Sequence, residues 1–306
     1  MIPISHVLAA TDLSSSSLHA VDRGFQIAST TGARYTVLHA LGLDALDVLR
    51  ELLAGRTAAL SEKIAQEARD SLTQAMSDPV RNQGVSAQLA LEDGAAAVVV
   101  PQQADAVDAD LVLLGAHGKG FLQRFMVGST ASRLLRTSRR PVLLVKEPCR
   151  APYRRILVAV DFSPGVERAV RTACALAPAA SLILLHVFEV PFEGKLHYAG
   201  VSEEVIHQYR FEARELATRR LHQLAAAVGL AKGDYVARVV HGDATRQILH
   251  EEEQYDCDLI VMGKHGTHVT EELLLGSVTK RVIAESRSDV LVVVDRQAPV
   301  DPVAPA

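Results

Sequence analysis

The stretch LVLLGAHGKGFLQRFMVGST at residues 111–130 decides the fold, because an apolar run enters a glycine-rich loop there and a helix start follows. The arrangement recurs as LIVMGKHGTHVTEELLLGSV at residues 259–278. Both copies fit the pattern G-x2-G-x9-G-[ST]. The glycines let backbone N–H groups approach an anion closely, and the N-terminus of the following helix offers unpaired donors. The Ser that ends each pattern can cap the helix or donate to a phosphate.

The whole chain repeats itself with an offset close to 148 residues. When residues 115–145 are laid on 263–293 without a gap, 11 of 31 positions are identical. An apolar run closed by an aspartate occurs at Asp12 and again at Asp161. A regular offset of this kind indicates tandem duplication. We therefore expect one domain at residues 1–147, a second at 153–296 and a disordered tail at 297–306.

Each half alternates strands and helices, which predicts a parallel sheet with helices on both faces. The strands are rich in Val, Leu and Ile, as strands buried on both faces are. They are expected at 5–11, 34–40, 86–91, 111–115 and 141–146, and again at 155–161, 181–187, 235–241, 259–263 and 289–294. The expected helices include 14–31, which opens with serines that can cap it, and 47–77, 95–105, 130–138 and 202–228.

Composition excludes several classes of protein. The 306 residues carry a formal net charge of -4, which argues against a general nucleic-acid binder. No apolar run approaches the ~18–20 residues of a membrane helix, and the start lacks a signal-peptide pattern. Three cysteines are too few for a disulfide framework or a four-thiolate zinc site. We expect a cytoplasmic protein that contacts neither membranes nor nucleic acids.

Other sequence patterns give little. The motifs G-x4-G-K-[ST] and G-x-S-x-G are absent, so neither a classical P-loop nor a nucleophile elbow is expected. His265 and His268 form a pair without a third nearby ligand, which is a weak zinc signal, and no metal-ligating residue is predicted. The run Glu251-Glu252-Glu253 is expected to be solvated helix surface.

With these features in place, both halves resemble domains of the universal stress protein family. The features that carry the resemblance are the Asp closing the first strand, the His near the end of the second, Asp-Leu-Ile-Val-Met-Gly at 258–263 and the glycine pattern. The resemblance implies an α/β fold of two tandem doubly wound five-stranded parallel sheets, each ordered 3-2-1-4-5, like adenine nucleotide alpha hydrolases. It also implies binding of ATP or a related adenine nucleotide, with Mg²⁺ as a candidate companion, in stress response or signalling.

The same resemblance assigns residues to the nucleotide. The first-strand Asp and the residue after the second-strand His would lie beside adenine and ribose, and the glycine loop with its Ser would hold phosphates. In the first half these residues are Asp12, Ala40, Gly115, Gly118, Gly128, Ser129 and Thr130. In the second half they are Asp161, Val187, Gly263, Gly266, Gly276, Ser277 and Val278.

The charges near the two loops differ. Residues 115–140 contain six basic side chains and no acidic one, whereas residues 263–288 contain four basic and three acidic ones. A polyphosphate should therefore prefer the first copy. The resemblance further implies that the fifth strands, 141–146 and 289–295, pair within the chain, with a homodimer as a further candidate assembly.

Two alternatives to a nucleotide-responsive binding protein stay open. One is an enzyme that slowly hydrolyses ATP or transfers a phosphoryl group at the same site, although the sequence assigns no catalytic residue. The other is a scaffold, or a sensor of a small molecule other than a nucleotide, in which the glycine loops are structural relics.

Overall fold

The computed structural model describes residues 3–42, 57–116, 127–190, 201–264 and 275–294. Several expectations fall outside these residues: Gly118, Gly266, the start of the helix expected from residue 47, and the tail at 297–306. All ten expected strands lie within them.

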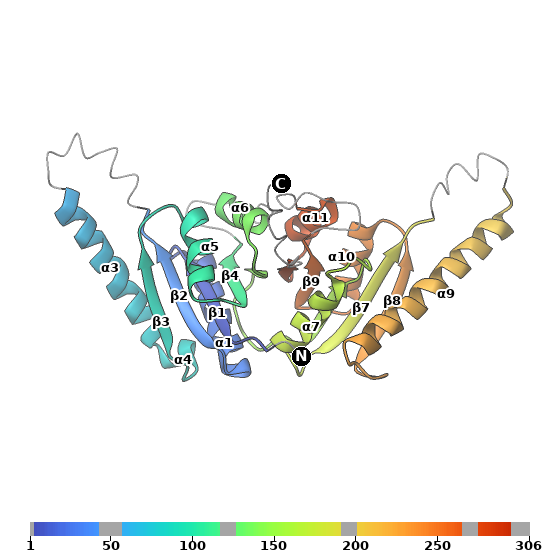
Figure 1. Cartoon of the computed structure of the whole chain (residues 1–306), viewed down its shortest axis with the longest axis horizontal. Helices are drawn as coiled ribbons and strands as arrows, with labels where there is room; N and C mark the ends of the chain where they lie inside the picture. Colours follow the sequence, from blue (N-terminus) through green and yellow to red (C-terminus); the bar gives the residue numbers. More distant parts are fainter. Residues whose placement is uncertain (1–2, 43–56, 117–126, 191–200, 265–274, 295–306) are drawn as a thin grey trace, which may run out of the picture.

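The ten strands form one continuous sheet (Figure 1). The first half contributes β1 (His6–Thr11), β2 (Arg34–Ala40), β3 (Ala87–Glu92), β4 (Leu111–Gly115) and β5 (Val142–Val145). The second contributes β6 (Arg155–Ala159), β7 (Ser181–Phe188), β8 (Tyr235–His241), β9 (Leu259–Gly263) and β10 (Asp289–Val293). The order β3-β2-β1-β4-β5-β10-β9-β6-β7-β8 repeats the pattern 3-2-1-4-5 in each half, with parallel pairs inside each half. The predicted fold class is therefore confirmed.

The two halves meet at β5 and β10, which pair in antiparallel fashion at the centre of the molecule. Leu143 lies opposite Leu291, and both side chains are fully buried. This pairing gives each fifth strand a hydrogen-bonded neighbour on both sides, so neither presents an unpaired edge to solvent.

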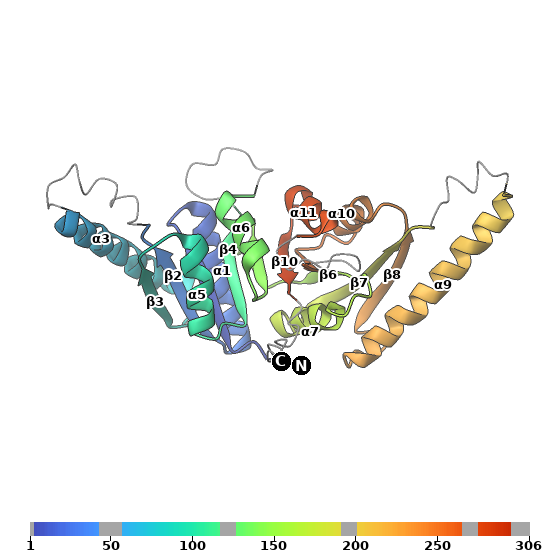
Figure 2. The ribbon, with the colours of Figure 1, turned by 45° about the horizontal axis from the view of Figure 1, so that its top comes forward.

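Helices cover both faces of the sheet, as Figures 1 and 2 show. One face packs against α1 (Ser15–Thr31), α3 (Thr57–Ser77), α7 (Val166–Leu176) and α9 (Glu203–Ala227). The other packs against α5 (Ala96–Ala106), α6 (Ser129–Thr137), α10 (Ala244–Gln254) and α11 (Ser277–Glu285). The short α4 (Pro79–Asn82) follows α3. Among the described helices, none is both long and apolar enough to cross a membrane.

Helix α1 illustrates how local sequence sets an element. Ser14 is the N-cap, and its hydroxyl accepts a hydrogen bond from the Ser17 N–H at 3.3 Å, as the serine run predicted. Gly32 ends the helix with a φ of 72°, a left-handed conformation that glycine adopts without a Cβ clash. The cap fixes the position of Ser17, which matters for the site below.

The expectation for the acidic run of α10 was wrong for Glu251 and Glu252, whereas Glu253 is exposed as expected. Glu251 and Glu252 are buried rather than solvated. Glu251 forms an ion pair with Arg238, with an oxygen–nitrogen distance of 2.7 Å. Glu252 accepts hydrogen bonds from the backbone N–H of Arg287 and from both the N–H and the hydroxyl of Ser288. The partners of Glu251 and Glu252 come from segments outside α10, so a local charge pattern does not predict the burial of these two side chains.

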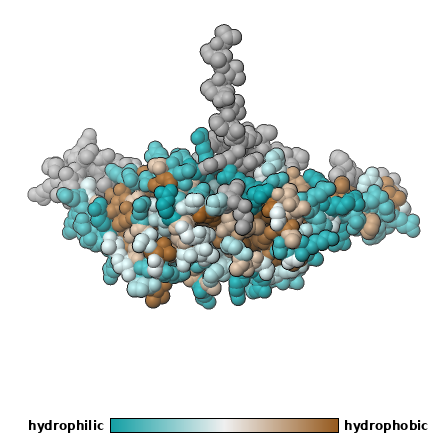
Figure 3. Space-filling view, turned by 60° about the horizontal axis from the view of Figure 1, so that its bottom comes forward, coloured by the Kyte–Doolittle hydropathy of each residue, from teal (hydrophilic) through white to brown (hydrophobic). Residues whose placement is uncertain are grey.

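One face of the molecule is mixed in polarity. On the face shown in Figure 3, apolar residues lie in small patches among polar ones. Such scattered apolar residues are ordinary on protein surfaces, whereas large continuous patches mark docking sites.

Candidate functional site

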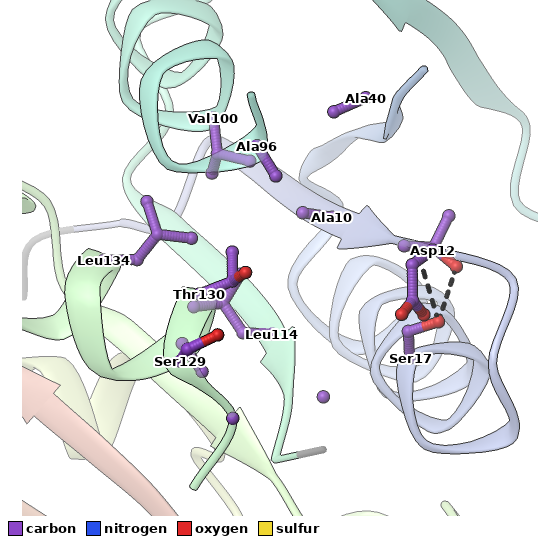
Figure 4. A pocket seen from close by; sticks show the side chains of 14 residues that line it. Ala10, Asp12, Ser17, Ala40, Ala96, Val100, Leu114, Ser129, Thr130 and Leu134 are labelled. Atoms are coloured by element: carbon purple, nitrogen blue, oxygen red, sulfur yellow. Dashed lines mark hydrogen bonds between the residues drawn. The ribbon is translucent and has the colours of Figure 1, made fainter. Parts of the chain in front are cut away.

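A cavity of about 250 Å³ opens in the first half at the carboxyl ends of β1 and β4. The connections from these two adjacent strands run to opposite faces of the sheet, which makes their junction a topological switch point. Figure 4 shows the side chains that surround the cavity. They are Ala10, Thr11, Asp12, Ser17, Ala40, Ala96, Val100, Leu114, Gly115, Gly128, Ser129, Thr130, Ala131 and Leu134.

Six of the seven residues predicted for the first half line this one cavity, and the seventh, Gly118, lies outside the described residues. They come from the ends of β1, β2 and β4 and from the start of α6. In Figure 4, Asp12 and Ser17 lie on one side of the cavity, and Ser129 and Thr130 on the other. The cavity thus has a carboxylate at one wall and a helix N-terminus at the opposite wall.

Asp12 is held by the turn between β1 and α1. Its Oδ1 accepts the Ser14 N–H at 3.0 Å, and its own N–H donates to the Ser17 hydroxyl at 3.2 Å. The Ser17 hydroxyl also pairs with the Thr11 hydroxyl at 2.8 Å. Leu13, which lies between Asp12 and Ser14 in this turn, has a φ of 63°, an unusual conformation for an apolar residue. This network presents the carboxylate of Asp12 at the cavity rim in a fixed orientation.

Gly115 is required by packing. A Cβ at this position would lie 2.7 Å from the Ser16 carbonyl oxygen and 2.8 Å from the Ser17 Cα. The first turn of α1 therefore approaches β4 as closely as it does only because residue 115 lacks a side chain. This role differs from the anion contact that the sequence suggested for the loop glycines.

The base of the glycine loop is closed by backbone hydrogen bonds. The Gly128 N–H donates to the Ala116 carbonyl at 3.0 Å, and the Gly276 N–H donates to the Lys264 carbonyl at the same distance in the second half. Each loop therefore leaves its strand and enters its helix at neighbouring points.

Helix α6 begins beside the cavity without a side-chain cap. Gly128 is its N-cap residue, and Ser129 is the first helical residue. The suggestion that the Ser hydroxyl caps the helix is therefore wrong for the described geometry. Ser129 and Thr130 are both exposed at the cavity wall. The first-turn N–H groups and the positive end of the helix dipole make this corner suitable for an anion.

The second half repeats much of this arrangement. Asp161 accepts hydrogen bonds from the N–H of Ser163 at 2.9 Å and from its hydroxyl at 2.6 Å. Phe162 has a φ of 58°, like Leu13 in the first half. Val187 lies in β7, Gly263 ends β9, Gly276 caps α11, and Ser277 and Val278 begin that helix, while Gly266 lies outside the described residues.

The side chains at matching positions differ in size and polarity. Ala40 and Val100 of the first cavity correspond to the larger Val187 and Ile248. Thr130 corresponds to Val278, so the second half lacks that hydroxyl. At these three positions the second half has two larger side chains and one hydroxyl fewer.

Two lysines each cap the C-terminus of a helix that belongs to the opposite half, namely α6 and α11. Lys264 follows β9 of the second half, is only 4 % exposed, and donates from Nζ to the Arg136 and Ser138 carbonyls at the end of α6. Lys146 of the first half donates from Nζ to the Ile283 and Ser286 carbonyls at the end of α11, at 2.8 and 2.7 Å. A cation at a helix C-terminus stabilises that helix.

These contacts show that some charges counted near one loop do not lie beside that loop in the folded chain. Lys264 was counted with the second loop, yet its ammonium lies on the first half's helix. Arg140 was counted with the first loop, yet it is paired with Asp105 at 3.0 Å and Asp108 at 2.7 Å. Lys119 and Arg124 lie outside the described residues. The charge count alone therefore does not determine which site is more positive.

The contacts of His39 and His186 and the burial of Cys257 indicate structural roles for these side chains. Within the described ranges, no group of three or more His, Cys, Asp or Glu side chains could hold a metal ion. His39 and His186 each contact a backbone carbonyl through Nδ1, at 2.7 Å in both cases. Burial lowers the pKa of His186 and raises the pKa of Cys257 to about 12, so this thiol stays protonated at neutral pH.

Sequence reasoning missed part of the cavity wall. Ser17 was considered only as part of a capping run, and Ala96 and Val100 belong to an expected helix with no motif. Ala96 and Val100 could have been found from their small apolar side chains. Both lie in the first turns of a helix that follows the carboxyl end of a strand, where ligands bind in such sheets.

Comparisons with known proteins give a consistent family. The model of the universal stress protein family matches residues 3–146 and again 152–294. Universal stress protein MJ0577 of Methanocaldococcus jannaschii is 32 % identical in an alignment of 156 residues that covers 46 % of this chain and 94 % of that protein. Universal stress protein Rv1996 of Mycobacterium tuberculosis is 28 % identical in an alignment of 205 residues that covers 64 % of this chain and 61 % of that protein.

Among solved structures, a universal stress protein from Archaeoglobus fulgidus superposes with a TM-score of 0.67 at 21 % identity. The superposition covers 94 % of this chain and 97 % of that one. At this identity the likeness concerns the fold alone, and it extends over both halves.

Proposed function

Because this chain belongs to the universal stress protein family, we propose that it binds ATP or a related adenine nucleotide in its first-half cavity and acts in stress response or signalling. The observation that carries the proposal is the convergence of six predicted residues on one cavity at the switch point of the sheet. Residues separated by more than half of the domain meet there, which a purely structural role for the glycine loop would not require.

The cavity offers a place for each part of the ligand. Ala10, Ala40 and Ala96 form an apolar wall of small side chains, which suits a flat purine ring. The fixed carboxylate of Asp12 can accept hydrogen bonds from ribose hydroxyls. The start of α6, with the hydroxyls of Ser129 and Thr130, suits the phosphates. Mg²⁺ would arrive with the phosphates, whose oxygens would supply most of its ligands at the start of α6.

We place the nucleotide in the first half rather than the second. The larger Val187 and Ile248 and the apolar Val278 support this ranking, because they reduce space and hydrogen-bonding capacity at matching positions. In this proposal the chain carries one nucleotide, and its two domains, residues 1–147 and 153–296, act as an internal pair held by β5 and β10. A cytoplasmic location accords with three cysteines that form no disulfide.

Blocking each cavity in turn tests the proposal. Ala40→Phe fills the first cavity, and Val187→Phe makes the equivalent change in the second half. We expect nucleotide-stripped protein to bind Mg-ATP in calorimetric titrations, Ala40→Phe to weaken binding at least about tenfold, and Val187→Phe to leave it unchanged. Circular dichroism checks that both variants are folded. Folded wild-type protein without binding heat, or binding lost only in Val187→Phe, would overturn the proposal.

A further inference from the structure

A second, larger groove lies in the other half of the molecule, between the first turns of α9 and the carboxyl ends of β7 and β8. In Figure 1 the elements that form it, α9, β7 and β8, lie at the right of the molecule, at the far end of the sheet from β3. Its volume is about 730 Å³, within the ~300–1,000 Å³ usual for small-molecule sites. The first-half cavity shares none of its lining residues.

The helical wall of the groove carries two arginines. Arg210 and Arg214 are four residues apart on α9, so they lie on one face of the helix. The Arg214 Nε donates to the Val239 carbonyl of β8 at 3.3 Å, which holds this guanidinium against the strand. Glu204 is the single acidic side chain among the described lining residues. Two guanidinium groups with this spacing favour a planar oxyanion such as a carboxylate.

Aromatic rings form the opposite wall and the rim. Phe188 and His241 lie opposite each other in the register of β7 and β8, with ring centroids 5.4 Å apart. Phe211 of α9 also lines the groove and is 60 % exposed. A large apolar side chain left this exposed can bury its surface against a flat apolar ligand.

The repeat supplies an internal comparison. Ala68 and Leu72 of α3 occupy the same buried positions as Ala217 and Leu221 of α9, at an offset of 149. With this alignment, the two arginines of the groove correspond to Ser61 and Ala65. At the strand ends, Phe188 corresponds to Leu41 and His241 to Asp93. The fold therefore does not require the basic and aromatic cluster, because the first half forms the same elements without it.

We propose that this groove binds a small aromatic carboxylate, with its ring against Phe188, His241 and Phe211 and its carboxylate on Arg210 and Arg214. The site is separate from the nucleotide cavity and does not depend on the proposed nucleotide binding. It would make the second half a receptor for a different small molecule from the one that the first half holds.

The probe is 2-naphthoate, and 2-naphthylmethanol is the matched neutral compound. Calorimetric titration of the full chain should give saturable binding of 2-naphthoate and at least about tenfold weaker binding of the alcohol. The double variant Arg210→Gln/Arg214→Gln should bind 2-naphthoate at least about tenfold more weakly than wild type does. Arg219→Gln, on the same helix but outside the groove, is the matched control and should bind within about twofold of wild type.

Two further measurements locate the site. Phe188→Leu, which introduces the first half's residue, should weaken 2-naphthoate binding, and Ala40→Phe should not affect it. The proposal is overturned if 2-naphthoate fails to bind saturably at millimolar concentration, if the alcohol binds equally well, or if Ala40→Phe removes the binding. The comparison of the two probes uses wild-type protein, so it remains decisive even if the double variant does not fold.

Discussion

Replacing Asp289 with Ala should lower the free energy of unfolding by about 3–5 kcal/mol. Asp289 is 2 % exposed at the junction of the two halves. Its Oδ1 accepts the Lys146 N–H at 2.8 Å, and its Oδ2 accepts the Tyr153 hydroxyl at 2.5 Å. The Arg23 Nε lies 3.5 Å from Oδ2, and the Arg23 guanidinium lies 4.0 Å from the centroid of the Tyr153 ring.

The magnitude follows from what the substitution leaves behind. Burial raises the pKa of Asp289, while Arg23 and the hydrogen bonds from Tyr153 and the backbone of Lys146 lower it. Truncation to Ala leaves the Arg23 charge buried with its partner removed, and it also removes the acceptor of a buried hydroxyl and a backbone N–H. Removing one member of a buried ion pair costs about 3–5 kcal/mol, and the lost hydrogen bonds are part of that total rather than an addition to it.

A double variant separates the charge from the packing. In Arg23→Met/Asp289→Asn both charges are gone, and the amide can still bond to the Lys146 N–H and the Tyr153 hydroxyl. We expect its stability to return to within about 1 kcal/mol of wild type. Urea unfolding of the full chain, followed by circular dichroism, gives the midpoints. The reasoning is refuted if Asp289→Ala unfolds at the wild-type midpoint, or if the double variant is as unstable as the single one.

Three further predictions concern residues that contact helices α11, α1 and α6. Burial lowers the pKa of Lys146 to about 8, below its ordinary value of 10.5, so the folded chain binds this proton less tightly than the unfolded chain. Stability relative to Lys146→Met should therefore rise between about pH 8 and 10.5 in urea titrations, and a flat difference would contradict the assignment. Gly115→Ala should destabilise the chain by about 1–3 kcal/mol and weaken Mg-ATP binding, because the added Cβ forces α1 and Ser17 to move. An unchanged free energy of unfolding and an unchanged affinity would show that α1 accommodates the Cβ without moving Ser17. Lys264→Met should weaken Mg-ATP binding about two- to fivefold by removing the cation at the end of α6, and equal calorimetric affinities would count against that link.

The sequence predicted the central strands well because they are apolar runs buried on both faces, as in Leu111–Gly115 and Leu259–Gly263. The edge strands β3 and β8 are only partly buried. The repeat located equivalent elements in both halves, and the serine run predicted the start of α1. These features depend on residues that are neighbours along the chain, so local pattern is enough to find them.

The features that the sequence did not reveal depend on distant contacts. Lys264 lies in one loop by sequence but caps a helix of the other half, and Arg140 pairs with Asp105 and Asp108 away from the loop. Glu252 is buried, and hydrogen bonds from the backbone N–H groups of Arg287 and Ser288 compensate the loss of its hydration. A charge count cannot anticipate such pairings, because only the packing of the two halves brings these groups together.

Counting the nucleotide bound per chain tests the central claim most directly. Nucleotide-stripped protein would be dialysed to equilibrium against labelled Mg-ATP, and the bound nucleotide measured against chain concentration. The account predicts one nucleotide per chain with micromolar affinity, roughly -8 kcal/mol, and loss of that site in Ala40→Phe. Folded protein that retains no nucleotide, or that binds two per chain with equal affinity, would contradict it.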